Sequence, residues 1–291
     1  MTESKTNKNT DREQVVRATS DVFIAALLSA PKNEPVLCGI INAVLENGGH
    51  VPIKTATVLN PFNVKEFAAD KQIVLDVRVQ DERDRIFCIE IQTDPHPAFA
   101  ERIVFGWADT FSGQLHAGSH YRKLHPVFCI VITEFRVIGD DDSVHLIFEL
   151  RERNRPEIVL SGHLQIHFLQ LHGLLKGHGE VLNGVSPRLR HWLNFLAFGG
   201  LKEEQEMAQL VENNPLVMEA VSELQRFTSD PAMRDLERRR KLWKLQYYSG
   251  IEAAKEESIA KVARNMKLKG YPTGDIAEMT GLSLVEIERL D

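Results

Sequence analysis

Apolar residues along the chain recur with two spacings, one typical of amphipathic helices and one typical of buried strands. Helical spacing predicts helices at residues 20–29, 34–49 and 96–115. Alternating or continuously apolar segments predict strands at residues 53–60, 72–80, 85–93, 126–135, 144–152 and 164–171. Ser20 or Asp21 is a suitable cap for the first helix, and the pair Gly48 and Gly49 ends the second.

From about residue 172 onward the patterning is helical and no further strand is expected. The predicted helices lie at residues 186–200, 202–213, 215–227 and 230–270, the last with an interruption near Ser249 and Gly250. The order of elements therefore predicts an α/β fold, with a mixed β-sheet core flanked by helices and followed by an all-helical C-terminal region. We expect a disordered N-terminus at residues 1–18, a core domain at 19–175 and a helical region at 176–291.

The last two predicted helices form a pair similar to a helix-turn-helix. Ala277 supplies the small residue of the first helix, Gly281 the turn and Ile287 the apolar anchor of the second, with Thr273 or Ser283 as caps. The second helix, however, carries Glu286 and Glu288 beside the single cation Arg289, and acidic side chains face phosphates poorly. We therefore favour a structural or protein-contact role for this pair over the reading of bases.

Composition narrows the class of protein only a little. The chain has 291 residues, 43% hydrophobic and 26% charged, as in ordinary globular proteins. Its apolar runs are too short for a membrane span, its N-terminus lacks the apolar centre of a secretion signal, and its three cysteines lack metal-like spacing. We expect a cytoplasmic protein with no membrane partner and with free core cysteines.

Charge is distributed unevenly along the chain. The net charge of −6 argues against a uniformly basic nucleic-acid binder. Residues 231–270 nevertheless carry an excess of six positive charges, and the basic stretch 234–244 (RDLERRRKLWK) is the better candidate for phosphate contact.

Two acids occupy unusual places in the apolar segments at residues 73–92 (IVLDVRVQDERDRIFCIEIQ). Side chains alternate faces along a strand, so Asp76 shares a face with Val74 and Arg78, and Glu90 shares a face with Cys88 and Gln92. A hairpin turn centred on Arg83 would pair residues whose numbers sum to 166 and would place Asp76 opposite Glu90. Because apolar residues share that face, both carboxylates are expected to be largely covered.

Two opposed and covered carboxylates repel each other, and several arrangements would relieve that repulsion. They could share a proton with raised pKa values, or they could bind a cation such as Mg²⁺, which takes one or two carboxylates together with water and phosphate oxygens. In the simplest alternative, each acid is solvated or paired with a neighbour such as Arg78. Spacing alone does not choose among these.

The same segments resemble a known nuclease family. The hairpin LDVRV…CIEIQ is similar to the catalytic hairpin of the PD-(D/E)XK nuclease superfamily, and the wider chain resembles the Rpn-type recombination-promoting nuclease/putative transposase family. Residues 20–29, 74–92, 101–133 and 270–290 carry the resemblance. It implies a restriction-endonuclease-like fold, a Mg²⁺ cofactor (with Mn²⁺ or Ca²⁺ as alternatives) and DNA as the substrate.

The resemblance assigns roles to residues of the hairpin. Asp76 and Glu90 would be catalytic and would ligate the metal, assisted by the main-chain carbonyl of Ile91. Gln92 stands where many superfamily members carry a catalytic Lys, so it would hydrogen-bond the attacking water without offering a positive charge.

Further positions are implied less directly. An acid from an early helix can complete the metal site in relatives, and Asp21, Glu34 and Glu46 are the candidates. Arg102, Gln114 and Tyr121 match polar positions of the family's next helix and turn, with Gln114 expected near the site and Arg102 near a phosphate or simply at the surface. His163, His167, His172 and His178 lack a standard zinc spacing, and His96 is better explained as a loop residue than as a site residue.

Two functions follow from these observations. The first is a Mg²⁺-dependent DNA endonuclease that hydrolyses phosphodiester bonds in recombination or transposition, with a homodimer expected if it cuts both strands. The second is a catalytically inactive protein of the same fold that binds nucleic acid or another protein. The replacement of Lys by Gln92 and the acidic overall charge favour the second, and the opposed acids favour the first.

Overall fold

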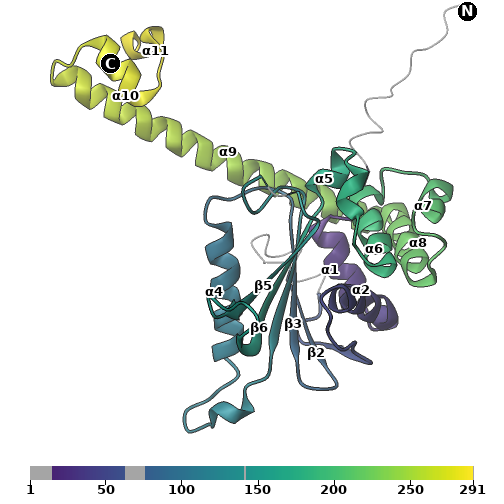
Figure 1. The fold of residues 1–291 in the computed structure, drawn as a ribbon. Helices are drawn as coiled ribbons and strands as arrows, with labels where there is room; N and C mark the ends of the chain where they lie inside the picture. The colour runs from purple at the N-terminus through teal and green to yellow at the C-terminus, as the bar shows by residue number, and fades with distance from the viewer. Residues whose placement is uncertain (1–14, 63–75, 141, 291) are drawn as a thin grey trace, which may run out of the picture. The chain divides into compact units, whose positions relative to one another are not determined.

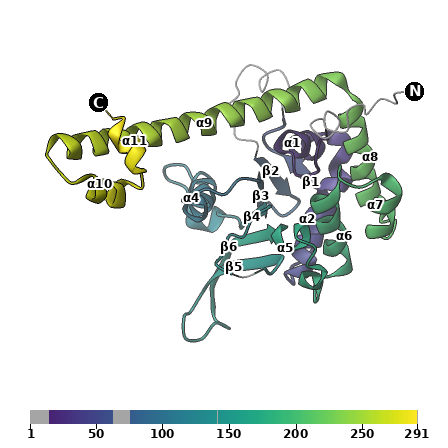
Figure 2. The same ribbon diagram turned by 90° about the horizontal axis from the view of Figure 1, so that it is seen from above.

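The computed structural model describes residues 15–62, 76–140 and 142–290 of the chain. Its contacts divide into two compact units, Met1–Glu237 and Arg238–Asp291. Figure 1 shows the mixed sheet and the helices of the first unit, and Figure 2 shows the same elements from above.

Among the described residues, one mixed sheet of six strands runs in the order β1-β2-β3-β4-β6-β5. β1 pairs antiparallel with β2, β2 with β3, and β5 with β6, whereas β3, β4 and β6 are parallel neighbours. The strands are β1 (Ala56–Val58), β2 (Val77–Asp81), β3 (Ile86–Gln92), β4 (Val127–Thr133), β5 (His145–Arg151) and β6 (Val159–Gln170). The predicted α/β fold is therefore confirmed, although residues 72–75 of the second predicted strand lie outside the described part of the chain.

Helices cover both faces of this sheet (Figures 1 and 2). On one face, Phe99 and Ile103 of α4 (Phe99–Ser112) pack against Val131 and Phe168 of the parallel strands. The opposite face carries the main core, which the N-terminal helices and the later helices fill together. These helices are α1 (Asp21–Ser29), α2 (Glu34–Asn47), α5 (His172–Leu175), α6 (Pro187–Phe198), α7 (Glu204–Leu210) and α8 (Pro215–Ser229), with the 3-10 turns η2 (Pro31–Asn33), η3 (Tyr121–Lys123) and η4 (Gly179–Leu182).

Local sequence explains where several of these helices begin and end. The hydroxyl of Ser20 accepts a hydrogen bond from the amide of Phe23, as expected for a cap, and Ser186 caps α6 in the same way. α2 ends before Gly48, and Gly49 turns the chain with φ +74°. β4 is buried along its whole length, as the continuous apolar run predicts for a central parallel strand.

The expected boundary near residue 175 does not coincide with the packing of the chain. Trp192 and Phe195 of α6 are almost fully buried in the core that α1 and α2 share with the sheet, so the helices up to Glu237 belong to the same compact unit. The N-terminal boundary also differs. Val16 and Ala18 are buried, and the amide of Ala18 donates to the carbonyl of Gly199, whereas residues 1–14 lie outside the described part.

The second unit contains most of one long helix and the closing pair. α9 (Pro231–Leu268) continues through Ser249 and Gly250, so the expected interruption is absent from this fully described helix. α10 (Thr273–Thr280) and α11 (Leu284–Glu288) pack Ile276 and Ile287 against Ala263 of α9. This small core explains why the pair folds back on the end of α9.

The turn of the closing pair follows the prediction in part. Gly281 adopts the left-handed conformation with φ +74°, and Ser283 forms a capping box with Glu286. Thr273 is the first residue of α10 and not its cap, because Pro272 occupies the cap position. The amino group of Lys267 donates to three carbonyls at the end of α11, which satisfies groups that a helix end otherwise leaves unpaired.

No single helix in the described part of the chain has both the length and the apolar character needed to cross a membrane. In the same described residues, the pair Asp21–Ser29 and Pro31–Asn47, bent by 83°, meets those criteria when its two members are counted together.

Candidate functional site

The β2–β3 hairpin has the register that the sequence predicts. Val77 pairs with Ile89, Arg78 with Cys88 and Gln80 with Ile86, so the partner numbers sum to 166. Continuing this register by one residue places Asp76, which precedes β2, opposite Glu90.

The hairpin turn is held by one acid of the charged stretch between the strands. The carboxylate of Asp81 accepts hydrogen bonds from the amides of Arg83 and Arg85, and it pairs with the Arg85 guanidinium at 2.6 Å. Asp84 provides the left-handed residue of the turn, with φ +60°. Because this fixed turn sets the register, it also determines which side chains of β2 and β3 face each other.

Strand alternation then separates a core face from a site face. Val77, Val79, Phe87 and Ile89 are buried in the main core. Asp76 and Glu90 belong to the other face, the one that α4 covers, and their side chains are only 23% and 22% exposed. The two carboxylates are thus half-buried at the border between the hairpin and α4.

Each of the two acids forms an ion pair with a different arginine. The Nε atom of Arg78 donates to Oδ2 of Asp76 at 3.1 Å, within the same strand region. Arg102, one turn into α4, donates from Nη2 to Oε1 of Glu90 at 2.6 Å and to Oε1 of Gln92 at 3.1 Å. The repulsion between the acids is therefore relieved by two separate ion pairs, the arrangement that the sequence left open for Arg78.

The protonation of Glu90 reflects these surroundings. Burial raises the pKa of the Glu90 carboxyl above its usual range, Arg102 partly offsets that effect, and the neighbouring Asp76 carboxylate adds to it. This effect of Asp76 on the pKa of Glu90 is expected for two carboxylates that face each other. A cation placed between them would favour the ionised form of Glu90.

Asn60 is a positioning residue that sequence reasoning missed. Its amide nitrogen donates to the main-chain carbonyl of Asp76 at 2.9 Å, and its side-chain oxygen accepts from the amide of Arg78 at 2.7 Å. These two bonds hold the backbone that carries Asp76 just before β2 begins. The only sequence signal was Asn60 standing directly before Pro61 at the end of the predicted strand.

Gln92 is held at both ends of its amide. Its oxygen accepts from Arg102, and its nitrogen donates to the carbonyl of Asp94 at 2.8 Å. Ile91 points its side chain toward the main core, so only its main chain is available to the site face. Asp94, half-buried two residues beyond Gln92, is a further acid near this end of β3 that the sequence analysis did not single out.

The early-helix acids have other partners. Glu34 accepts a hydrogen bond from the amide of Ala56, Glu46 pairs with Arg188 at 2.8 Å, and Asp21 accepts from the amide of Val22. Within the described residues, no group of three His, Cys, Asp or Glu side chains could hold a metal ion. The structure therefore supports two carboxylates at this site and does not add a third from α1 or α2.

Two of the expected substrate contacts lie away from the acids. The side chain of Gln114 donates to the carbonyl of His125 and accepts from its amide, which braces the loop after α4. Gln114 thus follows the C-terminal end of α4, whereas Arg102 lies near its N-terminal end. Tyr121, in η3 of the same loop, is 84% exposed.

Two histidines, His145 and His167, belong to a buried hydrogen-bonded group. His145 and His167 join ring nitrogens at 2.9 Å, and Asn47 and Gln165 continue this chain of hydrogen bonds. Burial lowers the pKa of His145 to about 4 and that of His167 to about 3, so both are neutral at physiological pH. His96 accepts from the amide of Ala98 just before α4, as expected for a loop residue.

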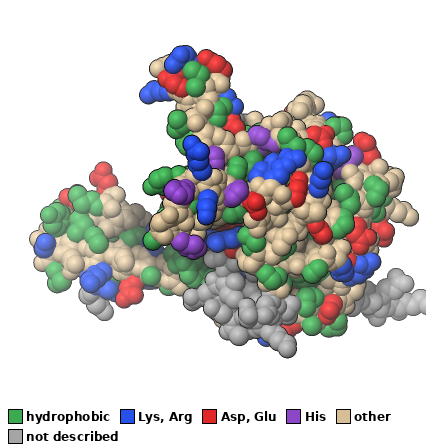
Figure 3. All heavy atoms as spheres, turned by 90° about the horizontal axis from the view of Figure 1, so that it is seen from below, with side chains coloured by type: hydrophobic (Ala, Val, Ile, Leu, Met, Phe, Trp, Pro, Cys, Tyr) green, Lys and Arg blue, Asp and Glu red, His purple; other side chains and the backbone are tan. Residues whose placement is uncertain are grey.

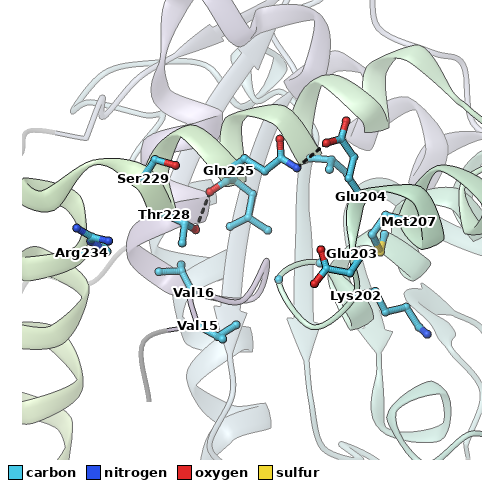
Figure 4. Close-up of a pocket in the computed structure, with 14 residues that line it drawn as sticks. Val15, Val16, Lys202, Glu203, Glu204, Met207, Gln225, Thr228, Ser229 and Arg234 are labelled. Atoms are coloured by element: carbon cyan, nitrogen blue, oxygen red, sulfur yellow. Dashed lines mark hydrogen bonds between the residues drawn. The ribbon is translucent and has the colours of Figure 1, made fainter. Parts of the chain in front are cut away.

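A groove of about 420 Å³ lies on the other side of the sheet, among the N-terminal segment, α7 and α8 (Figure 4). Val16 and Met207 form part of its apolar floor, and both Lys202 and Glu203 line it. Gln225 donates to Glu204 at its rim. Charges of both signs at its border give it no preference for an anionic or a cationic ligand.

Replacing Arg102 with glutamine is expected to raise the pKa of Glu90 further, because the guanidinium stabilises its ionised form. When the pKa of a carboxyl is higher in the folded than in the unfolded protein, the folded state binds more protons between those two pKa values. The free energy of unfolding therefore falls as the pH rises from the unfolded-state pKa through the folded-state pKa. The Arg102→Gln variant should therefore lose more stability over that pH range than the wild type. Carboxyl ¹³C NMR and unfolding at several pH values, both without metal, measure the two effects.

Arg188→Gln is the matched control, because Arg188 pairs with the more exposed Glu46. It should leave the titration of Glu90 unchanged. An identical Glu90 titration in the Arg102→Gln variant and the wild type would show that Arg102 does not stabilise the carboxylate.

The mixed sheet, the hairpin that carries two acids and the helix that leads from it to a parallel strand define a nuclease fold of the PD-(D/E)XK class. The chain belongs to the family described as PD-(D/E)XK nuclease family transposase, whose model matches residues 19–254. No curated protein and no solved structure gives a significant match. Family membership supports a role related to a nuclease or a transposase.

The residues present at the site fit the divalent ion that such nucleases usually use. Asp76, Glu90 and the carbonyl of Ile91 offer hard oxygen ligands, and Mg²⁺ is commonly held by one or two carboxylates with water in its remaining positions. The side chains of both acids are mostly covered, and burial, which Arg102 only partly offsets, raises the pKa of Glu90. A cation bound here would stabilise the ionised carboxylate of Glu90.

Proposed function

We propose that the protein is a Mg²⁺-dependent DNA endonuclease whose active site is the half-buried pair Asp76 and Glu90. The observation that carries the proposal is the register of the β2–β3 hairpin, which opposes the two acids on the face covered by α4. Family membership supports the same chemistry. Mn²⁺ would substitute for Mg²⁺ at oxygen ligands of this kind, and Ca²⁺ would bind there as the larger ion.

The bound ion would supply a water of lowered pKa and would neutralise charge on the phosphate. The residues of the chain would bind the ion and orient the attacking water. Asp76 and Glu90 would hold the ion, and Asn60 would keep the Asp76 main chain in place. Gln92, fixed by Arg102 and by the carbonyl of Asp94, would orient the attacking water by hydrogen bonding.

Arg102 would take part in both the resting and the substrate-bound site. Its guanidinium holds Glu90 and Gln92 in the absence of substrate. It is 45% exposed, so it can also reach a phosphate oxygen at the surface. A planar guanidinium suits both roles, because it binds carboxylates and phosphates with the same set of donors.

The test is cleavage of supercoiled plasmid in Mg²⁺ and in EDTA, combined with thermal unfolding over a Mg²⁺ titration. The proposal requires nicking only with the metal and a melting temperature that rises with Mg²⁺. Metal-independent nicking that survives repurification would contradict the proposal. So would the absence of nicking with Mg²⁺, Mn²⁺ and Ca²⁺.

Two observations favour a second function, a binding protein of the same fold without activity. Gln92 cannot supply the positive charge of a lysine, and each acid already has an arginine partner. DNA binding without cleavage, and with no effect of Mg²⁺ on stability, would support this alternative.

Gln92→Lys, which introduces the residue that many superfamily members carry here, is expected to lower the rate of cleavage about tenfold. Lysine cannot accept the hydrogen bond from Arg102, and its ammonium would lie beside that guanidinium. Single-turnover cleavage by Gln92→Lys and by the uncharged control Gln92→Met separates the lost bond from the added charge. Faster cleavage by Gln92→Lys than by the wild type would show that Arg102 does not take the place of the lysine.

A further inference from the structure

The loop between α4 and β4 has an unusual charge composition. From residue 110 to residue 133 the chain contains no Asp or Glu, although acids are more numerous than Lys and Arg over the whole sequence. The loop itself, residues 113–126, carries Arg122 and Lys123 together with three histidines. Its local charge is therefore opposite in sign to that of the chain.

The cations of this loop are directed to solvent. Arg122, Lys123, His116 and His120 are all exposed. Within the part of the chain that the structure describes, the side chains of Arg122 and Lys123 have no ion pair or hydrogen bond. The arginines of the β2–β3 hairpin and of α4 differ in this respect, since Arg78, Arg85 and Arg102 are each paired with an acid. The positive charges of Arg122 and Lys123 are therefore uncompensated.

The loop is nevertheless held firmly against the sheet. Gln114 makes two hydrogen bonds to the main chain of His125, and the ring of His163 contacts the carbonyl of Leu124 at 3.2 Å. The amide of Ile86 donates to the carbonyl of Pro126 at 2.9 Å. The cations are thus presented on a fixed backbone, which reduces the ordering cost of binding a partner.

Figure 3 looks at this end of the molecule and shows Lys, Arg and His side chains gathered on one part of the face, with few acids among them. A helix rises about 1.5 Å per residue, so the length of α4 places this loop roughly 20 Å from the end that carries Arg102. About six base pairs of a duplex span that length at roughly 3.4 Å per step.

We propose that the α4–β4 loop is a second contact surface for duplex DNA, where Arg122 and Lys123, with His116 and His120 beside them, bind backbone phosphates at a distance from the cleaved bond. This inference rests on the proposed function for the identity of the polyanion. Uncompensated and exposed cations on a fixed loop suit a regular array of phosphates, which they would bind without reading the sequence.

The experiment measures binding of a short fluorescein-labelled DNA duplex to the full chain by anisotropy, in EDTA, over a range of salt concentrations. Arg122→Ala/Lys123→Ala is expected to weaken binding about tenfold at roughly 0.1 M salt and to reduce the salt slope by about 2, as for the loss of two phosphate contacts. Lys176→Ala/Lys202→Ala removes the same charge from exposed positions elsewhere and should leave both values unchanged.

The outcomes separate this inference from the proposed activity. Wild-type protein that binds DNA through the loop but never cleaves it would remove the endonuclease and leave the loop surface in place. Affinity and salt slope equal to wild type in the loop variant, or an equal loss in the control variant, would overturn the inference. The absence of duplex binding by the wild type would also overturn it. Unchanged thermal unfolding of the loop variant excludes misfolding as the cause.

Discussion

Alanine at position 90 is expected to lower the rate of Mg²⁺-dependent plasmid cleavage by at least about a thousandfold, and alanine at position 76 by a similar factor. Asp76 and Glu90 are the two opposed carboxylates of the hairpin, and among the described residues no third His, Cys, Asp or Glu joins them in a metal-binding group. Losing either ligand leaves one carboxylate to hold the ion. Single-turnover nicking and a Mg²⁺ titration of the melting temperature measure the loss of rate and of metal binding separately.

The control for this prediction is Glu46→Ala, which makes the same change at an exposed acid paired with Arg188. It should cleave as the wild type does. Glu90→Gln adds a second comparison, because it keeps the shape of the side chain and removes its charge. Since burial raises the pKa of Glu90, the ionised carboxylate costs stability at neutral pH, and Glu90→Gln should be at least as stable as the wild type without metal.

Nicking by Glu90→Ala at the wild-type rate would contradict the assignment of the active site. Slow nicking with an unchanged response of the melting temperature to Mg²⁺ would have a different meaning. It would show that the ion binds elsewhere and that Glu90 acts on the substrate.

The part of the site that the sequence predicted depends on local rules. Strand alternation and a turn centred on Arg83 were sufficient to oppose Asp76 and Glu90, because the register of a tight hairpin is set by a few neighbouring residues. Asp81 fixes that turn through bonds to residues at most four positions away. Such short-range relations can be read from a sequence directly.

The part that the sequence could not predict depends on tertiary packing. Arg102 reaches Glu90 and Gln92 only because α4 crosses the face of β3, and Gln114 is carried away from the acids by the same helix. Asn60 holds Asp76 across sixteen positions of the sequence. The pairing of each acid with an arginine follows from the relative placement of helix and hairpin, which periodicity does not specify.

The boundary expected near residue 175 also differs from the packing of the chain, because packing depends on tertiary contacts. Strand and helix patterns change there, and a change of pattern resembles a domain boundary. Burial gives a different division, since α6 fills the core beside α1 and α2. Close approach of the chain at Gly200 also joins the N-terminal segment to the later helices. A side-chain carbon there would lie 2.1 Å from the carbonyl oxygen of Val16, in a backbone conformation with φ +83° that favours glycine.

Replacing Trp192 with alanine is expected to lower the free energy of unfolding of the first unit by about 3–5 kcal/mol. The Trp192 side chain is 1% exposed, and it packs close enough to α2 that a side-chain carbon at Gly39 would lie 3.2 Å from its ring. A chain that ends at residue 175 would lose α6 entirely and should not fold, because the core of α1, α2 and the sheet would lose one side. A chain that ends at residue 237 retains this core and should fold.

Thermal and urea unfolding, followed by near-ultraviolet circular dichroism, measure these differences. Trp243→Ala is the matched control, because Trp243 is a half-buried tryptophan of α9 that stacks on Tyr247 outside the first unit, and its loss should cost less. Cooperative unfolding of the chain that ends at residue 175, with stability equal to that of the chain that ends at residue 237, would show that α6 to α8 are an appended domain. A large loss in Trp192→Ala with no fold in the shorter chain would instead make the helices part of the nuclease core, so that any catalytic fragment must extend to Glu237.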